Sequence, residues 1–212
     1  MKNFNVSEKN ILIYRIIFTV LSWFTFITGF FINSISSGLP FIWLNSFIYY
    51  TMQTNFMVTI WFTLAIIWYK KPQLLEKITG ALKGAFTLYI TITFVIFAVL
   101  LQMFYPFPKG WAAFSNLVLH YITPIAFIFD WILTENKIKY KWTYMLYWIV
   151  YPVCYIIFAV IHGTITDNYI YYFFDINALG ILGFVMYTSI LIVFGIVLAG
   201  LYTAINRRRT KD

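Results

Sequence analysis

A few polar side chains lie inside long apolar runs, at spacings that could support chemistry. The run FSNLVLHYITPIAFIFDWIL places Asn116, His120 and Pro124 at successive i+4 steps, hence on one face of a helix. The run YYTMQTNFMVTIWF places Thr51 and Asn55 one helical turn apart. Counted by helical rise, Thr51 lies roughly 9 Å and His120 roughly 13 Å below the same end of their helices. We therefore expect Thr51 and His120 to meet across a helix interface.

Threonine and histidine together could form a two-residue acyl-transfer site. A threonine hydroxyl is a poor nucleophile until a base takes its proton, and histidine, with an ordinary pKa of about 6.5, is the usual base. Two structural interpretations stay open. A threonine in an apolar helix often bonds its own i−4 carbonyl, and a buried histidine often only links helices. Thr54 is a second threonine that could take the place of Thr51.

A second histidine, His162, follows the fifth apolar run and precedes Asp167 and Asp175. It could contact a substrate head group, orient His120, or cap a helix that faces water. Two histidines without closely spaced carboxylates do not make a recognisable zinc site. We therefore expect no metal and no other cofactor.

Asp130 lies ten residues beyond His120, which is roughly 15 Å along a helix. That distance places it outside a site built on His120. Arg15 is expected at the same depth, so a structural ion pair between the two is the leading interpretation. A proton relay through Asp130 is the alternative, but no chain of ionisable residues joins it to His120.

The residues that must position these groups are almost all apolar. Hydrophobic residues make up 62% of the 212, and charged residues 10%, whereas a soluble domain has about 25% charged residues. The sequence predicts one all-α, polytopic membrane domain over residues 1–212 with about six transmembrane helices. The expected spans are residues 11–32, 45–69, 81–104, 111–134, 142–161 and 179–204. Pro106 and Pro108 predict a tight turn between the third and fourth.

The basic residues predict the orientation of these spans. With six spans, every lysine and arginine except Lys109 falls on one side, which is the cytoplasmic side by the positive-inside rule. Both termini are then cytoplasmic, and tryptophans and tyrosines fall near the span ends, as interfacial belts do. The net charge of +8 is spread along the chain and not gathered on one face, which argues against a nucleic-acid partner.

Two further expectations concern the first residues and the single cysteine. The segment MKNFNVSEKN precedes an apolar run that is too long for a cleaved signal peptide, so we expect a retained first helix. Cys154 is the single cysteine, which excludes an intramolecular disulfide, and it should be a small buried apolar residue.

Three features together resemble a known family. They are the Asn116–His120 face continuing to a proline and an acidic residue, the Thr51 segment, and the aromatic-rich IHGTITDNYIYYFFD after the fifth run. These features, spread over residues 45 to 180, resemble the androgen-inducible family of transmembrane threonine hydrolases and its bacterial relatives. The resemblance implies hydrolysis of lipid esters, specifically fatty acid esters of hydroxy fatty acids. It also implies Thr51 as nucleophile and His120 as its histidine partner.

The functional expectation is therefore an intramembrane hydrolase, in the inner membrane of a bacterial cell. Its partner would be a membrane lipid or a lipid-ester substrate, contacted by Asn55, Asn116 and His162. The alternative is a non-catalytic binder of lipid or another small apolar ligand. A small transporter is less favoured, because inverted repeats and helices broken near the midplane are not evident. The sequence does not predict the oligomeric state.

Overall fold

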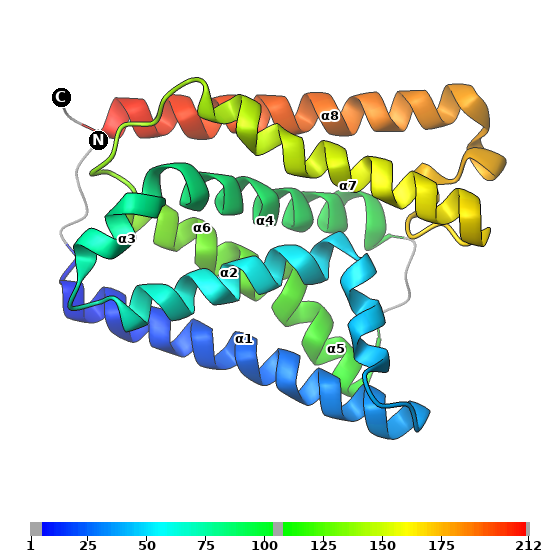
Figure 1. Ribbon diagram of the computed structural model, residues 1–212, viewed down its shortest axis with the longest axis horizontal. Helices are drawn as coiled ribbons and strands as arrows, with labels where there is room; N and C mark the ends of the chain where they lie inside the picture. Colours follow the sequence, from blue (N-terminus) through cyan, green and yellow to red (C-terminus); the bar gives the residue numbers. More distant parts are fainter. Residues whose placement is uncertain (1–5, 104–107, 211–212) are drawn as a thin grey trace. The chain divides into compact units, whose positions relative to one another are not determined.

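The computed structural model describes residues 6–103 and 108–210, apart from the side chain of residue 77, and the ordered elements in these ranges are all helical. The expected turn residue Pro106 lies outside the described residues. The α-helices are α1 (Glu8–Ser37), α2 (Tyr50–Ile67), α3 (Pro72–Ile78), α4 (Gly84–Ile96), α5 (Gly110–Leu117), α6 (Thr123–Thr134), α7 (Tyr144–Thr166) and α8 (Ile176–Arg209) (Figure 1). The 3-10 helices are η1 (Ile42–Ile48) and η5 (Tyr172–Phe174), and the π-helical turns are η2 (Thr79–Lys83), η3 (Phe97–Leu101) and η4 (Val118–Ile122).

Five helical stretches in the described ranges are long and apolar enough to cross a membrane. They are Glu8–Ser37, Thr79–Leu101, Gly110–Thr134, Tyr144–Thr166 and Ile176–Arg209. The second expected span is not among them. Its helix α2 has 18 residues, and Gln53, Asn55 and several threonines lower its mean hydropathy. The prediction of six spans therefore stays a prediction for this helix.

The chain divides into two compact units. Unit 1 comprises Met1–Lys139 with Arg209–Asp212, and unit 2 comprises Tyr140–Arg208. The single domain expected over residues 1–212 stays a prediction. The candidate residues Thr51, Asn55, Asn116 and His120 belong to unit 1, and His162 belongs to unit 2.

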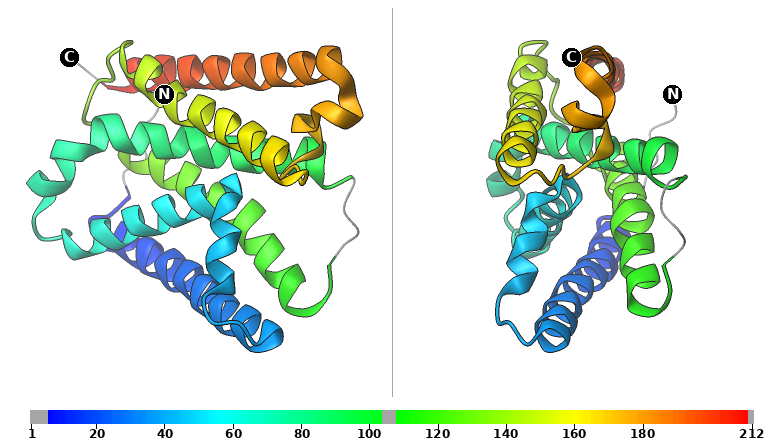
Figure 2. Two further views of the ribbon diagram at one scale, coloured as in Figure 1. Left: turned by 45° about the vertical axis from the view of Figure 1, so that its right-hand side comes forward. Right: turned by 90° about the vertical axis from the view of Figure 1, so that its right-hand side faces the viewer.

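In unit 1, α1 packs on α2, α2 packs on α4, and α4 packs on α6. The N-terminal end of α1 and the short helix α3 lie at one end of this unit, whereas η1 and the start of α5 lie at the other (Figures 1 and 2). Between the two ends, Val58, Phe62 and Phe127 are fully buried in one apolar cluster with Trp61 and Ile90. This cluster fixes the relative positions of the helices that carry the polar residues.

Local signals in the sequence explain where α1 begins and ends. Ser7 accepts a hydrogen bond from the backbone N–H of Asn10 at 3.2 Å, which caps the first turn. Gly38 follows the last turn with a left-handed φ of 67°, a conformation that glycine adopts without strain.

The start of α2 differs from the sequence prediction. The expected span begins at residue 45, but residues 42–48 form the separate 3-10 helix η1, and Tyr49 is extended with φ −81° and ψ 134°. Thr51 is therefore the second residue of α2, and the expectation of about six helical residues before it was wrong. The extended backbone at Tyr49 is the physical reason, since it breaks the helical hydrogen-bond ladder there.

Unit 2 contains α7 and α8. The buried residues Trp148, Tyr155, Ala159 and Gly163 lie along one stripe of α7. Cys154 precedes Tyr155 and points away from this stripe, so it is exposed. The prediction of a buried cysteine was therefore wrong, because one residue step rotates a helical side chain by about 100°.

Candidate functional site

Thr51 and His120 lie in direct contact. The Thr51 hydroxyl is 3.3 Å from His120 Nε2, and both side chains are half-buried. Thr51 comes from the first turn of α2, and His120 comes from the π-helical turn η4 between α5 and α6. The predicted meeting of these two residues is confirmed as a contact, while their catalytic role stays a prediction.

The hydrogen bonds of His120 define which of its nitrogens carries a proton. Nδ1 lies 3.1 Å from the backbone carbonyl of Asn116, which can only accept, so Nδ1–H is the donor. In a neutral imidazole the other nitrogen, Nε2, is then unprotonated and accepts the hydrogen bond from the Thr51 hydroxyl. The ring is thus held in the tautomer in which a base faces a hydroxyl.

Asn55 links the two backbone segments that carry this pair. Its side-chain Nδ2 donates to the carbonyl of Thr51 at 2.9 Å and to the carbonyl of Leu119 at 2.8 Å. Leu119 directly precedes His120, so the two hydrogen bonds connect α2 to η4. Both amide hydrogens are used, and Asn55 Oδ1 is buried without a hydrogen-bond partner among the described residues. Only this oxygen is left for the substrate contact expected of Asn55.

Phe97 packs face to face on the His120 ring, with centroids 3.7 Å apart and planes 15° apart. Each residue belongs to a π-helical turn, Phe97 to η3 and His120 to η4. Pro124 follows η4 and cannot donate a backbone hydrogen bond to the carbonyl four residues before it, which favours the wider turn. The sequence reasoning missed Phe97, because no spacing rule places it opposite His120.

Thr54 faces a different neighbour. It is fully buried, its hydroxyl lies 2.8 Å from the Thr93 hydroxyl, and it donates to the Thr51 carbonyl at 3.3 Å. Between the two threonines that the sequence offered, Thr51 is the one whose hydroxyl contacts His120.

The other two expected substrate-contacting residues have different positions. Asn116 contacts His120 through its backbone carbonyl. His162 lies near the end of α7 in unit 2, where Nδ1 is 3.5 Å from the Thr166 hydroxyl and the ring lies 6.1 Å from that of Phe158. His162 is therefore not one of the residues that unit 1 brings together.

A separate ionic cluster lies at the opposite end of unit 1. Arg15 Nε is 2.7 Å from Asp130 Oδ1, which confirms the expected ion pair. Lys83 Nζ is 2.7 Å from Asp130 Oδ2 and 3.8 Å from Glu135 Oε2. The contacts of Lys83 and Glu135 were not predicted from the sequence, because the lysines were used only to assign the cytoplasmic side. The position of Lys83 inside the expected span 81–104 was the signal that could have identified it.

In chemical terms, the Thr51–His120 contact provides a hydroxyl, a base and a fixed tautomer, which are three requirements of an activated nucleophile. No group of three histidine, cysteine, aspartate or glutamate residues that could hold a metal ion is found in the described part of the chain. No family model, no curated protein and no solved structure matches the chain, so the resemblance to the threonine hydrolases stays a prediction.

Proposed function

We propose that this chain is an intramembrane hydrolase of lipid esters that uses Thr51 as nucleophile and His120 as general base. The observation that carries the proposal is the 3.3 Å contact between the Thr51 hydroxyl and His120 Nε2, with Nδ1 held by the Asn116 carbonyl. The assignment of fatty acid esters of hydroxy fatty acids as substrates rests on the family resemblance.

The first half-reaction transfers the acyl group to the enzyme. The Thr51 oxygen attacks the ester carbonyl carbon while His120 Nε2 takes the hydroxyl proton. The tetrahedral intermediate then expels the alcohol, which receives that proton from Nε2. The products of this step are an acyl-threonine ester and a free hydroxyl on the leaving lipid.

The second half-reaction restores the enzyme. Water gives a proton to His120 Nε2 and attacks the acyl carbon, and the Thr51 oxygen leaves with the proton that Nε2 returns. The Asn116 carbonyl has the orienting role that a carboxylate has in a serine-type triad. Thr51 lies in the first turn of α2, where the helix dipole favours the negative charge of the intermediate.

The proposal includes the membrane topology. Six spans with both termini in the cytoplasm of a bacterial cell place Thr51 and His120 near the outer leaflet, from which a lipid ester would enter. The distribution of lysine and arginine supports this orientation. In this topology α2 crosses the membrane as the second of the six spans, and its polar residues Thr54, Asn55 and Thr59 face the interior of unit 1, where all three are fully buried.

The test is a mutant cycle on lipid-ester hydrolysis by the purified full chain in detergent. Thr51→Ala, His120→Ala and the double substitution should all lower turnover to a similar floor, because either loss abolishes the shared step. Thr51→Ser keeps a hydroxyl and should retain activity. An acyl-transfer probe such as a fluorophosphonate should label the wild-type chain and not Thr51→Ala.

Two results would contradict the proposal. They are near-normal turnover of Thr51→Ala, and additive effects of the two single substitutions. Either result would favour the non-catalytic binder of lipid or another apolar ligand, in which the same polar groups only hold a head group.

A further inference from the structure

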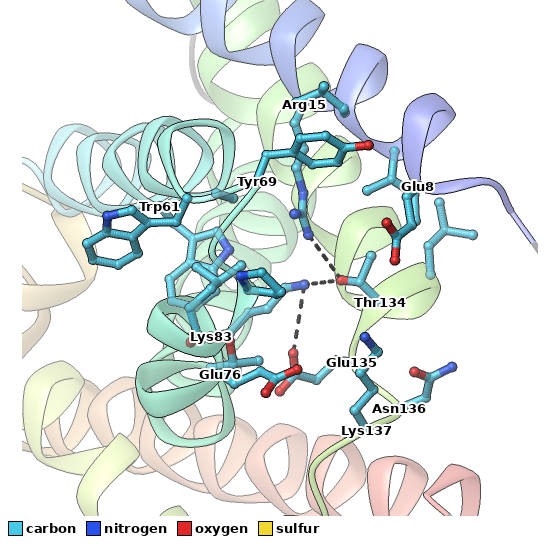
Figure 3. Close-up of a pocket in the computed structure, with 18 of the residues that line it drawn as sticks. Glu8, Arg15, Trp61, Tyr69, Glu76, Lys83, Thr134, Glu135, Asn136 and Lys137 are labelled. Atoms are coloured by element: carbon cyan, nitrogen blue, oxygen red, sulfur yellow. Dashed lines mark hydrogen bonds and ion pairs between the residues drawn. The ribbon is translucent and has the colours of Figure 1, made fainter.

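A cavity of about 400 Å³ lies at the end of unit 1 that contains α3. Its walls come from the first turns of α1, the last turns of α2, α3, η2 and the segment that follows α6. Figure 3 shows the side chains that line it, with charged groups of both signs around one space. The cavity is distinct from the Thr51–His120 site. Trp61, which lines it, is ten residues beyond Thr51 on α2, or roughly 15 Å by helical rise.

Lys83 forms part of the cavity wall but is already occupied by groups of the chain. It is 1% exposed and contacts Asp130 Oδ2 at 2.7 Å, the Asp130 carbonyl at 3.4 Å and the Thr134 hydroxyl. An ammonium has three N–H donors, so these contacts account for all of them. Lys83 therefore contributes a positive charge to the wall but has no N–H group left to bind a ligand.

Arg15 does have a free donor. Its Nε and Nη2 bond the two oxygens of Asp130 at 2.7 and 3.2 Å, and Nη2 also approaches the Thr134 hydroxyl at 3.4 Å. Its Nη1 has no hydrogen-bond partner among the described residues, although Arg15 is only 8% exposed. A guanidinium nitrogen without a partner, on a side chain that lines the cavity, fits an anionic oxygen, because Arg binds phosphate and carboxylate oxygens through such donors.

Carboxylates also line the cavity, with Glu8 among them. Glu76 and Glu135 both lie on its wall, and in the view of Figure 3 they are on the side of Lys83 away from Arg15. Trp68 and Tyr69 add aromatic surface to the lining. Carboxylates and aromatic faces both favour an ammonium group.

We propose that this cavity binds a zwitterionic head group, with a phosphate oxygen at Arg15 Nη1 and a primary ammonium near Glu76 and Glu135. The wall carries both cationic and anionic side chains around a single space, namely Arg15, Lys83, Lys137, Glu8, Glu76 and Glu135, and a wall of both signs favours a dipolar ligand over a simple anion. Two sources share this chemistry, a phosphatidylethanolamine molecule of the membrane and free phosphoethanolamine. The inference does not depend on the proposed hydrolase activity.

The experiment is native mass spectrometry of the detergent-purified full chain, titrated with phosphatidylethanolamine or with phosphatidylglycerol of the same acyl chains. Phosphatidylethanolamine should bind about tenfold more tightly, because phosphatidylglycerol has no ammonium for the carboxylates. Competition by free phosphoethanolamine would indicate that the head group alone is sufficient for binding. Binding of the lipid without such competition would identify the membrane lipid as the source.

Two variants separate this site from a general affinity for lipid. Arg15→Lys keeps a cation beside Asp130 but lacks the second terminal nitrogen, and Glu76→Gln removes an exposed carboxylate. Arg15→Lys should weaken the binding of both lipids about tenfold, because both carry the phosphate. Glu76→Gln should reduce the preference for phosphatidylethanolamine about tenfold. The matched control Asp167→Asn removes an exposed carboxylate of unit 2 and should leave the preference unchanged. Equal binding of the two lipids, or an unchanged preference in Glu76→Gln, would overturn the proposal.

Discussion

Replacing Asp130 with asparagine tests the ionic cluster of unit 1 most directly. Asp130 is 1% exposed and binds two cations, Arg15 and Lys83, each at 2.7 Å. Its removal leaves both cations desolvated, with Glu135 3.8 Å from Lys83 as the remaining acid of the cluster. A buried ion that loses its partner costs about 3–5 kcal/mol, so we expect Asp130→Asn to lower the free energy of unfolding by about that amount.

The companion substitution Arg15→Met should cost less. Asp130 then keeps Lys83 at 2.7 Å, so no lone charge remains, and we expect a loss of about 1–3 kcal/mol. The double substitution removes one positive and one negative charge and leaves Lys83 with Glu135. Its cost should fall short of the sum of the single costs by about 1–3 kcal/mol, the usual size of coupling between contacting residues.

The measurement is the unfolding of detergent-purified variants followed by intrinsic tryptophan fluorescence. The double-mutant cycle gives the coupling, and Glu76→Gln serves as an exposed control with little expected effect. Strict additivity of the two substitutions, or wild-type stability of Asp130→Asn, would refute the assignment of one shared buried carboxylate.

Three further predictions concern other parts of the chain. Cysteine at Ser37 should react with an impermeant maleimide added to intact cells and cysteine at Gln73 should not; the reverse pattern would contradict the proposed orientation. Thr54→Val should keep lipid-ester hydrolysis near the wild-type rate while lowering stability by about 1 kcal/mol, because its buried hydroxyl bonds another hydroxyl and not the base; a large loss of turnover would argue against this reading. Gly163→Ala should destabilise unit 2 by about 1–3 kcal/mol in thermal unfolding, because its Cβ would collide with the Tyr169 ring; unchanged stability would show that the ring moves aside easily.

Some contacts could be predicted from residue spacing, because side chains recur at fixed intervals along a regular helix. Thr51 with His120, and Arg15 with Asp130, follow from helical rise and from the cost of polar groups in apolar surroundings. Both pairs join residues that are far apart in the sequence, but each needs only the depth of a residue along its helix. Such a prediction of depth holds even when the boundary of a helix is misplaced by one turn.

Other features could not be predicted because they depend on local departures from the α-helix. The start of α2 depends on the extended backbone at Tyr49, and no strong helix-stopping residue signals it in the sequence. The stacking of Phe97 on His120 depends on two π-helical turns, whose positions a regular periodicity does not contain. The contact between His120 and the Asn116 carbonyl could not be predicted either, since a helical carbonyl ordinarily bonds the backbone N–H four residues later.

The π-helical turns have a consequence for insertions and deletions. Each such turn holds one residue more than an α-helical turn, so removing one residue there can restore an unbroken α-helix. The wide turn takes up the extra residue within one turn, so the helix beyond the deletion would keep its facing. In η4 such a deletion would leave a continuous helix from Gly110 onward and would remove the wide turn from which His120 contacts Thr51. The chain could thus lose one of its two polar centres in one genetic step, without losing a helix.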